Sequence, residues 1–513
     1  MPTLRRRHAV LLLVIVLTWG AWLRLASLAD RPLWQDECWT AAAIRDSNAA
    51  NLLRQTDLPI PPLFAVLAKC THALAAPIER GVRLPAALFG CLTPFLIYRA
   101  ARAAAASRSV ALAAATLSAS SIMLVVWSRE AKHYGIEATF AAAAAWIIFA
   151  VRRGSPRART CATAVLIGLV TVAPWFGYGV FFSLAPLLVL LFLPDARRRR
   201  TAVTIGIVTT AALAVSTVVL WSVAARGQSS NPALQSFWTE RYIDAGNLRS
   251  WFDALSRLAM SSYLLALPSD WLREGDQALP GALLLAAAVA GLIFWPRRGR
   301  REMGVWFIAP LALMALAAAA HRYPFGVPRF FVVWSPAALI LIAAGIVGLC
   351  RAAAKAALGD GRVGILAATI VCLLPATYVL NIPLRQAYWC YHDVPRVLRE
   401  LAEKRKPGEK VFVSLVAGPA VAFYGPAGDL DFVDYPRTAG NIPVPGFDYA
   451  ARTRDALAFA GRRFWIICIS DRNDAILRGI LSEAEKRGYS MEIVLQAGDR
   501  PALGNAVLLS MSR

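Results

Sequence analysis

The sequence predicts a polytopic α-helical membrane protein with a small α/β domain after its last span. Of the 513 residues, 58% are hydrophobic and only 17% are charged, whereas soluble domains usually carry about 25% charged residues. Apolar runs recur over the first 385 residues, and from about Arg385 the composition becomes that of a soluble domain. The predicted domains are therefore residues 1–385 and residues 386–513.

Eleven apolar runs approach the length of about 20 residues that a membrane span needs. They are 8–28, 84–101, 110–127, 134–151, 161–176, 178–194, 202–224, 280–296, 303–320, 328–349 and 363–384. The first run also fits a cleaved signal peptide, because Ser27-Leu28-Ala29 resembles a cleavage site, but the many later spans favour an uncleaved anchor. We therefore expect about 11 spans.

The basic residues predict the orientation of these spans, because Lys and Arg gather in cytoplasmic loops. The formal net charge is +23, and alternate loops carry the basic clusters: 5–7, 99–108, 152–159, 197–200, 297–301 and 351–362. The opposite loops are balanced; residues 29–83 hold six basic and six acidic side chains. The N-terminus is thus expected in the cytoplasm and the C-terminal domain outside. The charge is a topology signal, which argues against a nucleic-acid partner.

Two long segments fall on the predicted outer side, the loops 29–83 and 225–279. Within the first, Pro62 to Ala76 is apolar but short and is interrupted by Lys69 and His72. It is expected to be a helix at the membrane surface, since a full span there would invert every later loop. The second loop is rich in Trp, Tyr and Ser.

The soluble segment alternates predicted strands with predicted helices, which indicates an α/β domain. Strands are expected at 410–415, 463–469, 491–495 and 506–510, and helices at 392–404 and 474–487. No Gly-rich phosphate loop points to a nucleotide. The eight cysteines lack metal-ligand spacing; four of them lie on the predicted outer side, so a disulfide is allowed but unsupported.

The loop 29–83 carries the first candidate catalytic residues, the acid pair Asp36–Glu37. A carboxylate at the outer membrane face can accept a proton from an attacking hydroxyl, which is general-base catalysis. The other explanation of the pair is a hydrated loop acid or a cap for the helix that starts near Cys38. Asp57 is either a further acid, a metal ligand or a turn residue before Pro61.

Two outer clusters supply candidate cations. Arg129 and Lys132 lie three residues apart after the third span, next to Tyr134, and so share one helical face. Arg322 and Arg329 flank the turn between the ninth and tenth spans. Arg binds phosphate oxygens in a bidentate manner, so these residues are candidates for an anionic leaving group. Basic and aromatic residues at span ends are also common as interfacial anchors.

The motifs resemble those of the GT-C glycosyltransferases, best over residues 10–150. The relevant stretches read WQDECWTAAAI, DLPIPPLFAVLAK, RLPAALFG and WSREAKHYG, followed by RYPFGVPRFF and RVLRELAEKRKPGEKVFV. The likeness is greatest to the branch of protein O-mannosyltransferases and bacterial aminoarabinose transferases. It implies a GT-C fold, a polyprenyl-phosphate sugar donor and transfer with inversion to a hydroxyl or phosphate acceptor.

The resemblance also assigns roles to residues. Asp36 matches the first acid of the family's Asp-Glu motif and would be the general base, and Glu37 would be its partner. Arg129 matches a basic residue that implies binding of the donor phosphate. Many relatives carry Asp-x-His-Pro-Pro, but here Ile60 stands at the His position. A divalent metal bound at Asp57 is therefore only weakly implied, and the resemblance is also compatible with an enzyme that works without a metal.

The predicted function is transfer of a hexosyl or pentosyl group from an undecaprenyl- or decaprenyl-phosphate donor to a cell-envelope acceptor. The acceptor would be a glycolipid, a polysaccharide or a protein, at the outer face of a bacterial inner membrane. Asp36 and Glu37 are the expected catalytic pair; the expected donor-phosphate ligands are Arg129, Lys132, Tyr134, Arg322 and Arg329. The alternatives are a transporter or flippase of lipid-linked sugars and a non-catalytic subunit of an envelope complex.

Overall fold

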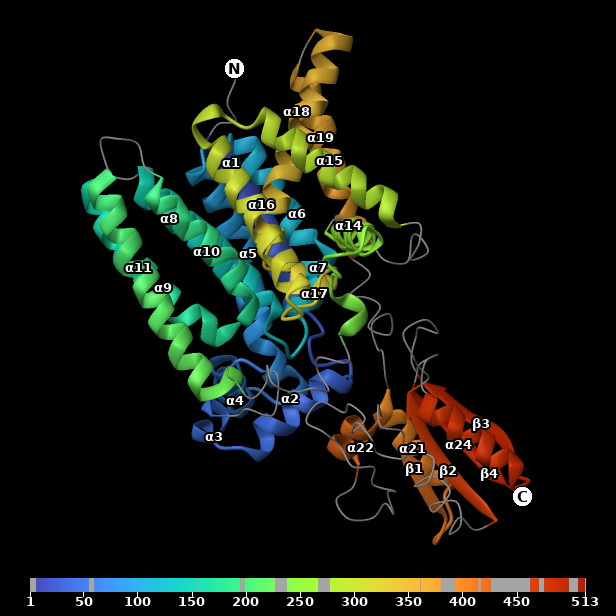
Figure 1. The fold of residues 1–513 in the computed structure, drawn as a ribbon. Helices are drawn as coiled ribbons and strands as arrows, with labels where there is room; N and C mark the ends of the chain where they lie inside the picture. The colour runs from blue at the N-terminus through green and yellow to red at the C-terminus, as the bar shows by residue number, and fades with distance from the viewer. Residues whose placement is uncertain are drawn as a thin grey trace.

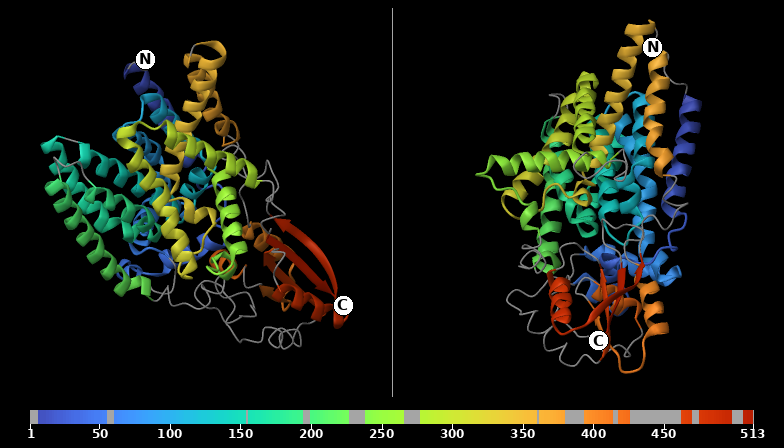
Figure 2. Two further views of the ribbon diagram at one scale, coloured as in Figure 1. Left: turned by 45° about the horizontal axis from the view of Figure 1, so that its top comes forward. Right: turned by 90° about the vertical axis from the view of Figure 1, so that its right-hand side faces the viewer.

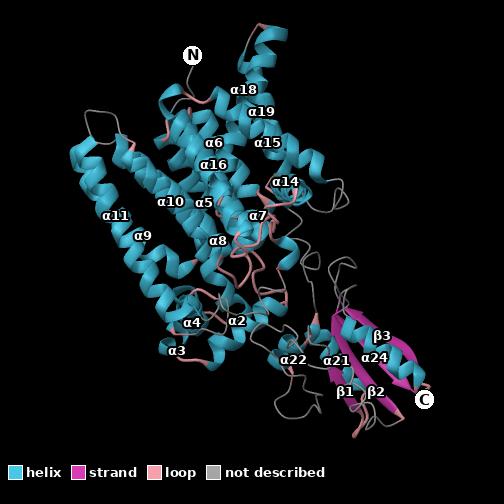
Figure 3. Ribbon diagram, viewed as in Figure 1, coloured by secondary structure: helices cyan, strands magenta, loops and turns pink. Residues whose placement is uncertain are grey.

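The fold is that of a helical bundle with a small sheet at one end, in a computed structural model. The structure describes residues 6–54, 60–153, 155–193, 199–226, 238–265, 277–359, 361–379, 393–413, 417–425, 462–469, 475–497 and 506–512. Figure 3 shows that the described strands all lie in the sheet and that the rest of the described chain is helices and loops.

Seven helices are long and apolar enough to cross a membrane. They are α1 (Arg6–Leu25), α5 (Ile78–Ala103), α8 (Tyr134–Arg153), α9 (Pro156–Phe176), α11 (Arg199–Leu220, continued by the π-helix η4, Trp221–Ala225), α16 (Arg297–Ala319) and α18 (Ser335–Leu358). An eighth candidate is the pair α6 (Arg108–Ser120) and α7 (Ile122–Ser128), which bends by 51° at Ser121. These helices confirm a polytopic membrane protein.

The remaining expected spans coincide with shorter apolar helices. These stretches are Tyr178–Phe192, Ala278–Phe294 and Val363–Pro375. The first contains η1 (Tyr178–Val180), α10 (Phe181–Val189) and η2 (Leu190–Phe192); the others belong to α15 (Ala278–Phe294) and α19 (Gly361–Val379). The total of 11 spans therefore stays a prediction. The expected surface helix is α4 (Pro62–Leu74), which is too short for a span.

Close helix packing holds the bundle together, as between α15 and α18. A Cβ on Gly291 would lie 1.9 Å from the Leu341 carbonyl oxygen, and one on Gly345 would lie 1.9 Å from that of Ala287. Each glycine thus lets the other helix's backbone approach, which is how small residues serve helix pairs in membranes. A side chain at either position would force the two helices apart.

The C-terminal domain contains a four-stranded sheet in the order β1-β2-β4-β3. Its strands are β1 (Lys410–Val413), β2 (Arg463–Ile469), β3 (Ser490–Ala497) and β4 (Ala506–Ser512), and its helices are α21 (Val394–Lys404), α22 (Gly418–Tyr424) and α24 (Ala475–Lys486). Strand β2 pairs in parallel with β1 and antiparallel with β4. The strands lie where the sequence places them, so the small α/β domain is confirmed.

The three helices between α1 and α5 gather at the end of the bundle that carries the sheet (Figure 1). They are α2 (Gln35–Asp46), α3 (Ala49–Leu53) and α4. The start of α1 and the turn between α18 and α19 lie at the opposite end (Figures 1 and 2). Three further elements complete the description: η5 (Thr239–Arg241), α14 (Leu248–Tyr263) and α17 (Pro328–Phe331).

Candidate functional site

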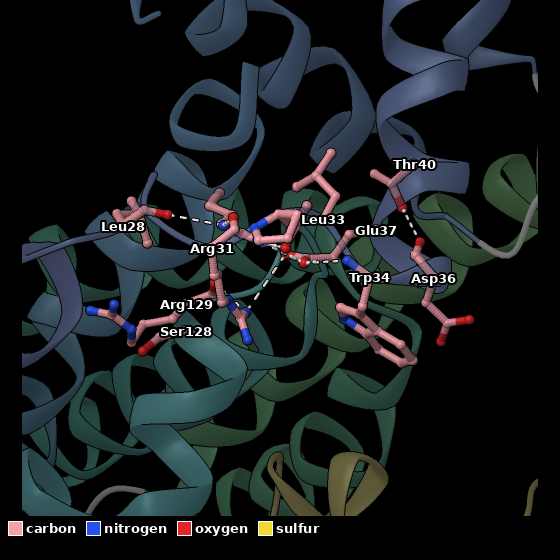
Figure 4. A network of polar contacts seen from close by, with 12 residues as sticks. Leu28, Arg31, Leu33, Trp34, Asp36, Glu37, Thr40, Ser128 and Arg129 are labelled. Carbon is pink, nitrogen blue, oxygen red and sulfur yellow. Dashed lines mark hydrogen bonds and ion pairs between the residues drawn. The ribbon is translucent and has the colours of Figure 1, made fainter. Parts of the chain in front are cut away.

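The acid pair lies in the first turn of α2, where carboxylates interact favourably with the helix dipole. Successive residues of a helix point in different directions, so the two acids have separate environments. The Glu37 side chain is completely buried, whereas the Asp36 side chain is 31% exposed. Figure 4 shows the two carboxylates pointing apart. Only one of them is open to a substrate.

Glu37 is held by a network of donors. Arg83 of α5 donates from Nε to Oε1 at 2.7 Å and from Nη2 to Oε2 at 2.6 Å. The amide of Ala131 donates to Oε1 at 2.8 Å and that of Trp34 to Oε2 at 3.3 Å. Burial by itself raises the pKa of Glu37, but the charges of Arg83 and Arg31 and these hydrogen bonds hold it below its ordinary value. Glu37 is thus an ionised structural anchor.

Arg83 also fixes the chain that leads into α2. Its Nη1 donates to the carbonyls of Leu28 and Arg31, at 3.0 and 2.8 Å, and its Nη2 donates to that of Pro32 at 3.0 Å. The guanidinium is fully buried. Sequence reasoning missed this residue, because an arginine just before an apolar run is typical of a span-end anchor, and its partner lies 46 residues away.

Asp36 forms an ion pair with Arg329 of α17, with 3.0 Å between Oδ2 and Nη1. The Arg329 guanidinium lies over the rings of Trp238, Phe330 and Tyr134, with its carbon 5.1, 5.4 and 5.8 Å from the ring centroids. Cation–π contacts of this kind fix a guanidinium in a largely apolar setting. The structure thus brings together Asp36, Arg329 and Tyr134 from three distant parts of the sequence.

Lys132 adds a second positive charge to this group. It is 6% exposed, and burial lowers the pKa of its ammonium, an effect that the charges of Asp36 and Glu130 oppose and that of Arg329 reinforces. No hydrogen bond to Lys132 is found within the described part of the chain. We call these four side chains the Asp36 cluster: an acid (Asp36), two cations (Lys132 and Arg329) and a phenol (Tyr134).

Glu130 is a buried acid next to this cluster that sequence reasoning did not single out. Neither of its carboxylate oxygens has a hydrogen-bond partner among the described residues. Burial, opposed by the charges of Arg31 and Arg83 and reinforced by those of Glu37 and Asp36, raises the pKa of Glu130 to about 8. Glu130 is therefore mostly protonated at neutral pH and contributes little negative charge to the site.

Arg129 points away from Asp36. Its Nη1 donates to the carbonyls of Leu23 and Ala26, at 2.8 and 2.6 Å, and its Nη2 donates to that of Ser27 at 3.3 Å. These are carbonyls at the C-terminal end of α1, which lack partners within the helix. Figure 4 places Arg129 on the side of Glu37 away from Asp36. Its predicted contact with a donor phosphate stays untested, and its guanidinium is occupied.

Two other predicted site residues lie apart from the Asp36 cluster. Arg322 is exposed, and its charge acts on Tyr242, which stacks on His321. Asp57 lies outside the described residues, so the structure does not place it. Among the residues that the structure does place, no group of three His, Cys, Asp or Glu side chains could hold a metal ion, and the seven cysteines there are free thiols.

Comparisons with known proteins agree with this architecture. Residues 60–221 match the family described as dolichyl-phosphate-mannose-protein mannosyltransferase. No curated protein matches in a sequence search. The fold resembles the crystal structure of ArnT from Cupriavidus metallidurans in the apo state, with 14% identity and a TM-score of 0.56 over 98% of this chain and 97% of ArnT. It also resembles the structure of ArnT bound to undecaprenyl phosphate, with 15% identity and a TM-score of 0.54 over 99% of this chain and 98% of ArnT.

The fold also resembles the archaeal oligosaccharyltransferase AglB from Archaeoglobus fulgidus, in complex with an inhibitory peptide and a dolichol-phosphate. That match has 14% identity and a TM-score of 0.54, and covers 94% of this chain and 73% of AglB. The resemblance to the GT-C glycosyltransferases is confirmed, and the fold of the chain is the GT-C fold.

Proposed function

We propose that the chain is a glycosyltransferase that moves a sugar from a polyprenyl-phosphate donor to an envelope acceptor. The observation that carries this proposal is the Asp36 cluster: a part-exposed carboxylate, paired with Arg329 and close to Lys132, at the end of a membrane bundle. A lipid-linked sugar presents a tail, an anionic phosphate and a polar headgroup. The apolar bundle can accommodate the lipid tail, and the two cations can bind the phosphate. The carboxylate can take part in the reaction at the sugar headgroup.

In the proposed reaction Asp36 accepts the proton of an acceptor hydroxyl as its oxygen bonds to the anomeric carbon. The bond from that carbon to the phosphate oxygen breaks, and the lipid phosphate leaves with the electron pair. A single displacement inverts the anomeric configuration. Arg329 and Lys132 stabilise the departing phosphate, an interaction that is strong in a site shielded from water, and the Tyr134 hydroxyl lies next to it.

The ion pair suggests an order for these events. In the present structure Arg329 donates to Asp36 through Nη1 alone, whereas a phosphate can accept from two N–H groups of one guanidinium. A donor phosphate that takes Arg329 would leave the Asp36 carboxylate free to receive the acceptor. Donor binding would thereby create the base only when the leaving group is in place.

The finer assignments are proposals of the same kind. The donor sugar is a hexosyl or pentosyl group, and the acceptor is a glycolipid, a polysaccharide or a protein. The undecaprenyl phosphate bound to ArnT and the dolichol-phosphate and peptide bound to AglB support a lipid phosphate and leave the acceptor open. The placement is a bacterial inner membrane with α2 and the sheet outside.

A divalent metal at Asp57 stays a separate prediction. One structure of the Archaeoglobus fulgidus oligosaccharyltransferase contains Zn and sulfate, but the residues described in this chain offer no ligand group for an ion. The metal prediction therefore rests on Asp57 alone. Comparing the transfer rate with and without a chelator, in the wild type and in Asp57→Asn, tests it.

The decisive experiment compares the purified wild type with Asp36→Asn, using radiolabelled undecaprenyl-phosphate sugars and envelope extracts as acceptors. Asparagine keeps the shape but cannot take the proton, and general bases contribute about 10²–10⁴-fold to such reactions. We expect a rate loss of that order with little change in donor affinity. Asp253→Asn, an exposed acid of α14, is the matched control and should retain the wild-type rate.

Two outcomes would contradict the proposal in different ways. Equal rates for the wild type and Asp36→Asn would remove Asp36 from the chemistry. A wild type that binds the donors but transfers no sugar to any acceptor would favour transport or a non-catalytic role instead.

A further inference from the structure

The C-terminal domain holds α2, the helix of Asp36, through two adjacent residues of α22. At one end of α2, the Tyr424 hydroxyl accepts a hydrogen bond from the Leu33 amide at 2.7 Å. At the other end, the Arg45 guanidinium lies 5.0 Å from the centroid of the Phe423 ring and donates to the Phe423 carbonyl at 3.5 Å. The short helix α22 therefore contacts α2 at both of its ends.

Apolar packing joins the same two elements. The buried side chains of Cys38, Ala41 and Ile44 in α2 belong to one cluster with those of Ala420 and Val421 in α22. This cluster continues into the domain through the apolar sides of α21 and the sheet. The contact is thus a packed interface, with the two polar contacts at its ends, and Figure 1 shows α22 next to α2.

The Tyr424 hydroxyl does two things at once. It accepts the Leu33 N–H and donates to Glu79 Oε1 of α5 at 3.0 Å. Burial raises the pKa of Tyr424, as do the neighbouring Cys38 and Glu79, so the hydroxyl keeps its proton and can donate. One oxygen atom thereby links the C-terminal domain, the chain before α2 and the first turn of α5. A phenylalanine at this position would fill the same space and make neither hydrogen bond.

This link acts on the start of α2. The amides of two successive residues are held by side chains: that of Leu33 by Tyr424, and that of Trp34 by Glu37. The Leu33 carbonyl also accepts from the Cys38 thiol at 3.3 Å. Asp36 follows Leu33 by three residues. A shift of the chain segment that leads into α2 therefore moves the Asp36 carboxylate relative to Arg329. Misplacing a reacting group by about 1 Å can cost about 10²-fold in rate.

We propose that Tyr424 is a positioning residue, through which the C-terminal domain sets the placement of Asp36. The inference rests on the proposed function for its effect on catalysis, but the hydrogen bond that carries it can be tested without any reaction. It also gives the domain a role, because part of the active-site scaffold is built by Tyr424, which lies 391 residues after Leu33 in the sequence.

The test uses the full-length protein in nanodiscs as wild type, Tyr424→Phe and Ser510→Ala. Ser510 accepts a hydrogen bond from Arg463 Nε at 2.9 Å within the sheet, so Ser510→Ala is the matched control that removes one hydroxyl from the same domain. Hydrogen exchange of the Leu33 amide and the kinetics with undecaprenyl-phosphate sugars are both measured. For Tyr424→Phe we expect faster exchange at Leu33, and kcat lower by about tenfold with the KM for the donor within about twofold.

The control should match the wild type in exchange at Leu33 and in kcat. Unchanged exchange at Leu33 in Tyr424→Phe would overturn the proposal whatever the activity. Faster exchange with an unchanged kcat would also overturn it, because the link would then hold the loop without affecting catalysis. If the wild type transfers no sugar, the proposed function fails. The hydrogen-exchange data alone then decide whether Tyr424 fixes the chain segment that leads into α2.

Discussion

Two neighbouring acids in this protein differ because of what surrounds each of them. Asp36 has one ion-pair partner and is part-exposed, whereas Glu37 is completely buried between Arg83 and two backbone amides. A carboxylate with its lone pairs occupied and no access to solvent is a poor candidate to take a proton from an acceptor. The catalytic role is therefore proposed for Asp36, and Glu37 shapes the loop that presents it.

The Glu37–Arg83 pair makes a prediction about stability. Removing one partner of a buried ion pair costs about 3–5 kcal/mol, because the other charge is left unpaired, whereas replacing both partners is much less costly. Glu37→Gln should therefore lower the midpoint of thermal unfolding in detergent more than the double variant Glu37→Gln/Arg83→Met does. A double variant that is less stable than Glu37→Gln would show that the contacts of Arg83 with the backbone outweigh the ion pair.

Glu130 makes a prediction about pH. Its carboxyl titrates near the ordinary value of 4.5 when unfolded but has a pKa of about 8 when folded. Between these values the unfolded chain releases a proton that the folded protein keeps, so rising pH favours unfolding. The stability of the wild type relative to Glu130→Gln should thus fall between about pH 4.5 and 8 and then level off. A difference that is independent of pH would show that Glu130 is ionised when folded.

At the scale of elements, two arginines connect the first span to the broken span α6–α7 by capping helix ends. Arg24 of α1 donates to the carbonyls of Ser118 and Ala119 at the end of α6, at 3.1 and 3.0 Å, where the bend to α7 leaves them without helical partners. Arg129, which follows α7, donates in return to the end of α1. The broken span α6–α7 and the span α1 are thereby tied together at the end of the bundle that holds the site.

This arrangement predicts the result of replacing Arg129 with glutamine. The carbonyls at the end of α1 would lose a charged donor, so the midpoint of thermal unfolding should fall, as it should in Arg24→Gln. Binding of undecaprenyl phosphate, measured well below that midpoint, should change little in either variant. Selective loss of lipid binding in Arg129→Gln, with normal stability, would instead support the phosphate contact that the family resemblance implies.

The elements were predictable from the sequence, but the contacts between them were not. The strands at 463–469 and 506–512 follow from short apolar runs, and the apolar helices follow from their composition, because both signals are local. The bidentate contact of Arg83 with Glu37 joins residues 46 apart, and the hydrogen bond from the Leu33 amide to the Tyr424 hydroxyl joins residues 391 apart. No local pattern contains such pairings, so Asp36 could be predicted while the residues that hold its helix could not.

At the scale of the whole molecule, the arrangement of charge predicts which end faces the cytoplasm. The C-terminal part of α18, which carries Arg351 and Lys355, and the turn to α19 lie at the end opposite to α2 and the sheet. Basic loops stay on the cytoplasmic side, so the end that carries Asp36 should face outward, where a lipid-linked donor can supply a sugar without a nucleotide.

Single cysteines can test this orientation in intact cells, in a background where Cys70 and Cys161, which are exposed, and Cys390, which lies outside the described residues, are replaced. Ala357→Cys lies near the α18–α19 turn and Glu403→Cys lies on α21 of the C-terminal domain; both positions are exposed. A membrane-impermeant thiol reagent should label the second at once and the first only after the cells are permeabilised. The reverse pattern would place Asp36 in the cytoplasm, where water-soluble nucleotide sugars compete as donors, and would remove the main reason to expect a polyprenyl-phosphate substrate.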